Sequence, residues 1–153
     1  MTELALVGDI GGTNSRFGLV EPGSTDVRDI EVLKNNSFSS LEEAIGAYIK
    51  ARGLTSTAAA AVAVAGPVDG DVVSLTNRDW SFTRESLRKA ALAQRFHLLN
   101  DFEALAMSLP HLEGDDIIQI GGETPTKPGV KIVLGPGTGL GMATLAPLPQ
   151  GGW

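Results

Sequence analysis

The chain has 153 residues, of which 42% are hydrophobic, so it can bury a core of its own and is not expected to be disordered. Its 18 acidic residues outnumber 12 singly scattered basic residues, and the net charge of −6 makes nucleic acid and anionic membranes poor candidate partners. No apolar run approaches the roughly 20 residues of a membrane span, and the first residues lack a signal-peptide pattern, so we expect a cytoplasmic protein.

The amino-terminal residues predict three strands. Apolar runs at 4–7 and 17–20 lie on either side of a glycine-rich turn, which is typical of a β-hairpin. A third segment at 30–33 alternates apolar with charged residues, and we expect it to form a half-exposed strand.

A helix and two further strands follow. Ser39 and Ser40 precede apolar residues at helical spacing from 41 to 49, with Glu42 and Glu43 placed to complete a capping box, and Gly53 ends the helix. The alanine-rich segment 58–65 has helical propensity, but its valines and the Gly-Pro that follows favour a buried strand. Asp69-Gly70 then predicts a hairpin turn into a strand at 72–75.

The next part of the chain alternates again between helix and strand. Thr83 is the predicted N-cap of a helix that runs to about Gln94, and a short buried strand is expected at 96–99. Apolar residues at helical spacing predict another helix at 102–109, and 117–120 is a strand candidate.

Two more predicted strands, at 130–134 and 142–145, lie on either side of a second glycine-rich turn. The order of elements implies an α/β lobe followed by the first strands of another lobe. We place a small lobe at 1–110 and the start of a larger lobe at 111–153. The final residues offer no helix or strand to close an edge, so we expect the larger lobe to be cut short.

The first glycine turn is the leading candidate for phosphate binding, because glycines let several backbone N–H groups converge on an anion. A strand rather than a helix follows the turn, and no Gly-Lys-Ser/Thr is present, so neither the P-loop nor the dinucleotide fingerprint fits. The alternative is an ordinary tight hairpin. Asp9 is suited to hold Mg²⁺ through water molecules. The predicted phosphate-binding residues are Gly8, Asp9, Ile10, Gly11, Gly12, Thr13 and Asn14.

Asn100 and Asp101 follow a buried strand, at the end where α/β sheets usually bind ligands. A kinase acting on an alcohol needs a carboxylate that accepts the hydroxyl proton, and Asp101 is the candidate base. Asn100 can orient neighbouring sugar hydroxyls, because its amide both donates and accepts hydrogen bonds. The alternative is that Asp101 only caps the helix that follows.

Two further glycine segments are candidates for ligand contact. Gly66-Pro67 ends a predicted strand and would let a sugar approach the backbone, although it can be a simple strand terminator. In the second turn we assign Gly137 and Thr138 to the phosphates and Gly139 to the sugar. A flexible linker is the alternative there, but apolar strands lie close on both sides.

The chain resembles the bacterial glucokinase family, within the sugar kinase and actin-like ATPase superfamily, in four segments that occur in this order: GDIGGTNSRFGL, AVAGPVDGDVVSLTNRDWSF, LLNDFEALAMSLP and GPGTGLGMATL. The resemblance implies an actin-like ATPase (ribonuclease H-like) lobe with a mixed sheet, in an enzyme that closes on glucose. It implies transfer of the ATP γ-phosphoryl group to the glucose 6-hydroxyl, with Asp101 as base and Asn100 as glucose ligand. It also implies homodimers.

Members of this family continue well past the position of Trp153, and the resemblance implies that further sugar ligands and the adenosine pocket lie in that part. We therefore expect the 153-residue chain to have negligible glucokinase activity by itself. The alternatives are a kinase for another hexose or an amino sugar, and a non-catalytic sugar-sensing module. The phosphoryl donor also stays open, because ATP, other nucleotides and polyphosphate present similar phosphates to a glycine turn.

Overall fold

The computed structural model describes residues 4–75, 78–123, 129–136 and 140–153. It divides into two compact units, Met1–Asp101 and Phe102–Trp153, which we describe separately. The lobe boundary expected at residue 110 is not tested by this division and stays a prediction. None of the helices in the described segments combines the length and the apolar character that crossing a bilayer requires.

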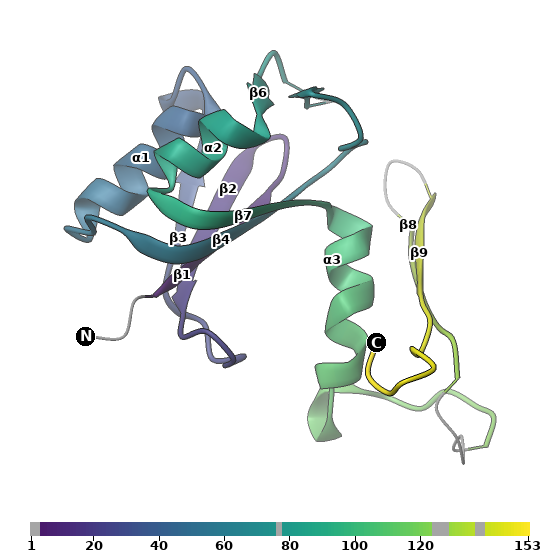
Figure 1. The fold of residues 1–153 in the computed structure, drawn as a ribbon. Helices are drawn as coiled ribbons and strands as arrows, with labels where there is room; N and C mark the ends of the chain where they lie inside the picture. Colours follow the sequence, from purple (N-terminus) through teal and green to yellow (C-terminus); the bar gives the residue numbers. More distant parts are fainter. Residues whose placement is uncertain (1–3, 76–77, 124–128, 137–139) are drawn as a thin grey trace. The chain divides into compact units, whose positions relative to one another are not determined.

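The first unit is built on a five-stranded mixed sheet with the strand order β3-β2-β1-β4-β7 (Figure 1). The predicted hairpin is confirmed, since β1 and β2 pair antiparallel, as do β2 and β3. In contrast, β4 runs parallel to both β1 and β7. The strands are β1 (Ala5–Ile10), β2 (Asn14–Val20), β3 (Arg28–Lys34), β4 (Thr57–Val64) and β7 (Ala93–Asn100).

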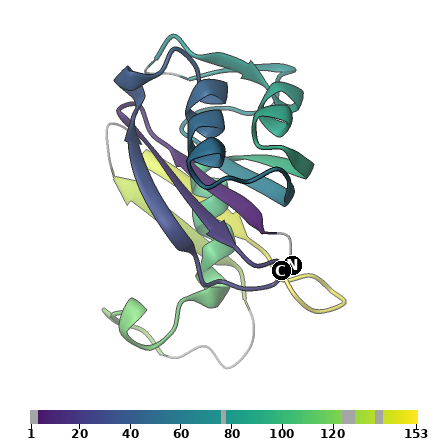
Figure 2. The ribbon, with the colours of Figure 1, turned by 90° about the vertical axis from the view of Figure 1, so that its left-hand side faces the viewer.

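Helices α1 (Leu41–Ala51) and α2 (Arg84–Ala90) cover one face of this sheet, as Figures 1 and 2 show. The predicted cap at Thr83 is confirmed, and of the two serines before α1 it is Ser40 that caps the helix, while Glu43 accepts hydrogen bonds from Ser39. The Ser40 side chain accepts a hydrogen bond from the backbone N–H of Glu43, and Thr83 forms a capping box with Ser86. These caps satisfy backbone donors that the first turn of a helix leaves without a partner.

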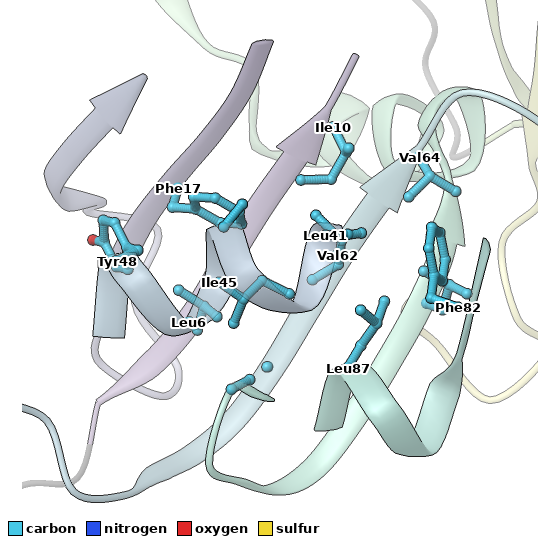
Figure 3. Packing of buried hydrophobic residues seen from close by; sticks show 14 of the residues in the cluster. Leu6, Ile10, Phe17, Leu41, Ile45, Tyr48, Val62, Val64, Phe82 and Leu87 are labelled. Carbon is cyan, nitrogen blue, oxygen red and sulfur yellow. The ribbon is translucent and has the colours of Figure 1, made fainter. Parts of the chain in front are cut away.

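The core lies between the sheet and the two helices (Figure 3). Alternate strand residues point toward the helices and the helical residues recur at the spacing of one face, so each element contributes a single apolar side. A two-stranded sheet of β5 (Val72–Ser74) and β6 (Ser81–Thr83) adds Phe82 to this core. The largest fully buried hydrophobic side chains are Leu6, Ile10, Phe17, Leu19, Leu41, Ile45, Tyr48, Val62, Val64 and Leu87.

Two expectations for this unit were wrong in detail. The strand after Asp69-Gly70 pairs with β6, so these two residues do not form the turn of a hairpin with β4. Helix α2 ends at Ala90 rather than near Gln94, because Leu92 has a φ of 50° and breaks the helical path. Strand β7 therefore begins earlier than the sequence pattern indicated.

The second unit contains helix α3 (Asp101–Ser108), which begins at the last residue of the first unit, and an antiparallel hairpin of β8 (Lys131–Pro136) and β9 (Leu140–Leu145). Two short 3-10 helices, η2 (Leu109–His111) and η3 (Gly114–Asp116), follow α3. The predicted helix and both predicted strands are confirmed.

The strand expected at 117–120 is wrong. These residues pair with no strand in the described part of the chain, and Ile118 and Ile120 are 87% and 97% exposed. A strand needs a partner for its backbone groups, and an apolar sequence alone does not supply one.

Candidate active site

Three of the predicted site segments lie at one edge of the five-stranded sheet. Strands β1, β4 and β7 are parallel, so their carboxyl ends meet at the same edge, and the register sets Ile10, Val64 and Asn100 in one row. The first glycine turn follows Ile10, Gly66-Pro67 follows β4 and Asp101 follows Asn100. The fold thus brings together segments that are far apart in the sequence, at the edge where α/β sheets usually bind ligands.

Asn100 holds the Gly66 segment in place. Its Nδ2 donates a hydrogen bond of 3.0 Å to the Gly66 carbonyl oxygen. Gly66 has a φ of 133°, a backbone conformation that side chains with a β-carbon avoid. The glycine predicted to admit a ligand is therefore also required by the backbone, and Asn100 has a structural partner in addition to any sugar.

Asp101 is half-buried and is the first residue of α3. A carboxylate in the first turn of a helix is favoured by the helix dipole, whether or not it also acts on a ligand. Its position directly after the row keeps it at the same sheet edge as the first glycine turn.

In the first glycine turn, the carbonyls of Gly11 and Thr13 accept hydrogen bonds, and two of the amides are available for a ligand. The Gly11 N–H donates to the Asn14 carbonyl over 2.9 Å, while the Gly11 and Thr13 carbonyls accept from Asn35. Among the described residues, no protein acceptor takes the N–H groups of Gly12 and Thr13. Backbone donors of this kind are what an anion-binding turn presents to its ligand.

The candidate magnesium ligand Asp9 is exposed and forms an ion pair with Arg16. Their side chains are 61% and 59% exposed, and the Arg16 Nη1 lies 3.1 Å from the Asp9 Oδ2. The described residues contain no group of three or more acidic, histidine or cysteine side chains that could enclose a metal. Mg²⁺ bound mainly by phosphates and water needs only one or two carboxylates, so Asp9 fits this type of site. Because exposed ion pairs contribute little, Arg16 is a weak competitor.

The second glycine turn combines a packing role with its predicted ligand role. Gly137, Thr138 and Gly139 lie outside the described residues. The two flanking glycines, Gly135 and Gly141, pair across the hairpin, and the Phe102 ring lies against both. A β-carbon would come within 2.6 Å of the ring at Gly135 and 2.0 Å at Gly141, so these positions need glycine to accommodate Phe102.

One depression in the described residues of the first unit lies away from these site residues. A depression of about 420 Å³ lies at the opposite sheet edge, near the starts of β4 and β7, between the ends of the two helices. Its lining includes Ile49, Lys50, Leu54, Ala90 and Leu92. None of the predicted site residues contributes to it, so it is a separate surface feature.

Residues 6–153 of the sequence match the model of the glucokinase family. The chain belongs to the glucokinase family. The glucokinase of Ralstonia nicotianae is 45% identical over 150 residues, which cover 95% of this chain and 44% of that relative. The glucokinase of Chromohalobacter salexigens is 42% identical over 147 residues, which cover 96% of this chain and 46% of that relative. This glucokinase-family chain spans about half the length of the curated relatives it matches.

Solved structures of a glucokinase and of a hexokinase share this architecture. The glucokinase of an Antarctic psychrotroph superposes with a TM-score of 0.87 at 30% identity, covering 99% of this chain and 48% of that one. The ROK hexokinase of Thermus thermophilus has the same fold at 18% identity, with a TM-score of 0.68 and 94% of this chain covered against 47% of that one. The predicted fold class, an actin-like ATPase lobe with a mixed sheet, is confirmed.

Sequence reasoning missed Asn35, which is fully buried and contacts the first glycine turn. The expected third strand ends just before an Asn35-Asn36 pair, and asparagine is common where side chains bond to neighbouring backbone. That pair was the available signal. The partners of Asn35 are distant in sequence, so their identity could not be read from it.

Proposed function

We propose that this chain supplies the phosphate turn, the base and part of the sugar site of a glucokinase, which transfers the γ-phosphoryl group of ATP to the 6-hydroxyl of glucose. The observation that supports this is the common row of Ile10, Val64 and Asn100. It brings a turn with available amides and a carboxylate to one sheet edge. The membership of the glucokinase family supports the choice of reaction.

In this proposal each segment has one task. Asp101 accepts the proton of the sugar hydroxyl as the phosphoryl group transfers, while Asn100, Gly66 and Pro67 contact other sugar hydroxyls or the ring. Residues 8–14 bind the nucleotide phosphates through their backbone, and Asp9 holds Mg²⁺ through its water molecules. Mg²⁺ would neutralise charge on the transferred phosphates. Gly137, Thr138 and Gly139 complete the phosphate and sugar contacts.

These residues indicate a phosphoryl transfer, but they specify neither the phosphoryl donor nor the sugar. The turn amides contact phosphates only, and a structural neighbour is described as an inorganic polyphosphate/ATP-glucomannokinase from an Arthrobacter strain. Another neighbour is described as a putative N-acetylmannosamine kinase from Listeria monocytogenes. Both share the fold at 20% and 21% identity, so a kinase for another hexose or an amino sugar is the alternative.

A chimera tests the proposal, because the 153-residue chain alone is expected to have negligible turnover. Residues 1–153 replace the matching segment of Ralstonia nicotianae glucokinase, and a coupled assay follows glucose phosphorylation. The chimera is expected to phosphorylate glucose. Asp101→Asn is expected to lower kcat by about 100- to 10,000-fold, the usual contribution of a positioned general base, while glucose binding persists.

Asp26→Asn is the matched control, because Asp26 is exposed between β2 and β3, away from the carboxyl ends of the parallel strands. Its kcat should equal that of the parent chimera. Retention of turnover within about tenfold in the Asp101→Asn chimera would refute the role of Asp101 as base. A folded chimera that phosphorylates only other sugars would favour the alternative substrate. One that binds sugar without any turnover would favour a sensing module.

A further inference from the structure

Asn35 is a fully buried polar side chain whose hydrogen bonds converge on the first glycine turn. Its Nδ2 donates to the Gly11 carbonyl over 2.8 Å, and its backbone N–H donates to the Thr13 carbonyl over 2.9 Å. Its Oδ1 accepts from the Ser15 hydroxyl, which is also fully buried, over 2.7 Å. A buried amide without partners would be costly, and here both ends of the amide are bonded, so its orientation is fixed.

The bond to the Gly11 carbonyl determines where the next amide points. The peptide unit that joins Gly11 to Gly12 is planar and trans, so its C=O and N–H point in opposite directions. Because Asn35 draws the carbonyl toward the protein interior, the Gly12 N–H is directed away from it. This N–H is one of the two in the turn that lack a protein acceptor among the described residues.

Arg78, from a third segment of the chain, donates hydrogen bonds to Asn35 and to the neighbouring Asn36. Its Nη2 donates to the Asn35 carbonyl over 2.8 Å and its Nη1 to the Asn36 Oδ1 over 2.9 Å. The guanidinium carbon lies 4.4 Å from the centre of the Trp80 ring, which is buried. Arg78, which lies between β5 and β6, thus supports η1 (Asn35–Ser37), which in turn supports the glycine turn.

We propose that Asn35 is a positioning residue for phosphate binding, which fixes the Gly11–Gly12 peptide so that the Gly12 N–H faces the phosphate chain of the donor. This inference rests on the proposed function, because it assumes that the first glycine turn binds phosphates. Asn35 itself does not touch the phosphates. It acts through the backbone that it holds.

The test is a ¹⁵N NMR titration of the 153-residue chain with inorganic triphosphate, which needs no adenosine pocket. The Gly12 and Thr13 amide signals of the unsubstituted chain are expected to shift saturably. Asn35→Asp keeps an acceptor for the Ser15 hydroxyl but sets a carboxylate oxygen against the Gly11 carbonyl. This variant is expected to bind triphosphate about tenfold more weakly, because the loss of one hydrogen bond to a charged ligand has an effect of this size. It is also expected to abolish the Gly12 shift.

Asn36→Asp is the matched control, because it adds the same charge at the adjacent, exposed position and keeps the acceptor for Arg78. Its affinity should stay within about twofold of the unsubstituted chain. The spectrum of each variant also reports whether it is folded. Should Asn35→Asp fail to fold, Arg78→Gln provides the test, since it removes the bond to the Asn35 carbonyl and should reduce the Gly12 shift.

The possible failures are distinguishable. If triphosphate shifts the turn amides of the unsubstituted chain and those of Asn35→Asp equally, Asn35 is not a positioning residue, whereas the phosphate turn stands. If Arg78→Gln is used instead of Asn35→Asp, an unchanged Gly12 shift likewise overturns the inference. If triphosphate does not shift the turn amides of the unsubstituted chain, the phosphate turn itself is wrong, and the inference falls with it.

Discussion

Replacing Asn100 with alanine and measuring stability in the absence of sugar tests the structural role of Asn100 alone. The substitution removes the 3.0 Å hydrogen bond to the Gly66 carbonyl. A net hydrogen bond contributes about 0.5–1.5 kcal/mol to stability, and a half-buried carbonyl can recruit water, so we expect a loss of about 1 kcal/mol. With a urea m-value of about 1–2 kcal/mol/M for a unit of this size, the unfolding midpoint should fall by about 0.5–1 M.

The assay is urea unfolding followed by Trp80 fluorescence, because Trp80 is buried in the core of the first unit. A Trp153→Phe background removes the other tryptophan, which lies in the second unit. Arg95→Ala is the matched control on the same strand, since Arg95 is exposed, and its midpoint should hardly change. Equal midpoints for Asn100→Ala and Arg95→Ala would refute the stabilising bond to Gly66.

Two further predictions concern packing and charge. Gly141→Ala sets a β-carbon 2.0 Å from the Phe102 ring, so thermal unfolding should show that the second unit loses about 1–3 kcal/mol of its free energy of unfolding. Gly129→Ala is the control, because the space around Gly129 is open, and its stability should not change. Equal losses in the two variants would contradict the packing argument. The hydrogen bonds from Arg88 lower the pKa of Glu85 to about 2 from its ordinary 4.5, so their contribution to stability is present above pH 4.5 and is lost as the pH falls toward 2. In a ¹³C NMR titration, Arg88→Gln should return the Glu85 pKa toward 4.5, and an unchanged value would exclude Arg88 as the cause.

The parts of the fold that depend on local chemistry could be predicted from the sequence. Ser40 and Thr83 cap helices through bonds to residues three positions later, and such spacing is visible in a sequence. The β1–β2 hairpin and the β8–β9 hairpin were predicted from apolar runs on either side of glycine turns. The alanine-rich segment was predicted as a strand because Val62 and Val64 outweigh the helical propensity of alanine, and this is confirmed.

The errors and omissions depend on contacts between distant residues. Ala91 to Ala93 read as a continuation of α2, but Thr57 donates its hydroxyl hydrogen bond to the Ala91 carbonyl from the start of β4, and the chain turns there. Asn35 and Gly11 are far apart in the sequence, as are Phe102 and Gly141. The role of Asp101 was predicted from its place after a strand, and its action on a sugar stays a prediction.

The four consecutive alanines of β4 have a consequence for how reliably this chain assembles. Ala58, Ala59, Ala60 and Ala61 have identical side chains, so they do not favour one alignment of β4 against its neighbouring strands over another. A two-residue slip would keep the valines facing the helices yet carry Gly66 out of reach of Asn100. Thr57 at one end, and Val62, Val64 and the Gly66–Asn100 hydrogen bond at the other, distinguish the native alignment, so misalignment of β4 is a folding error that the alanines themselves do not oppose.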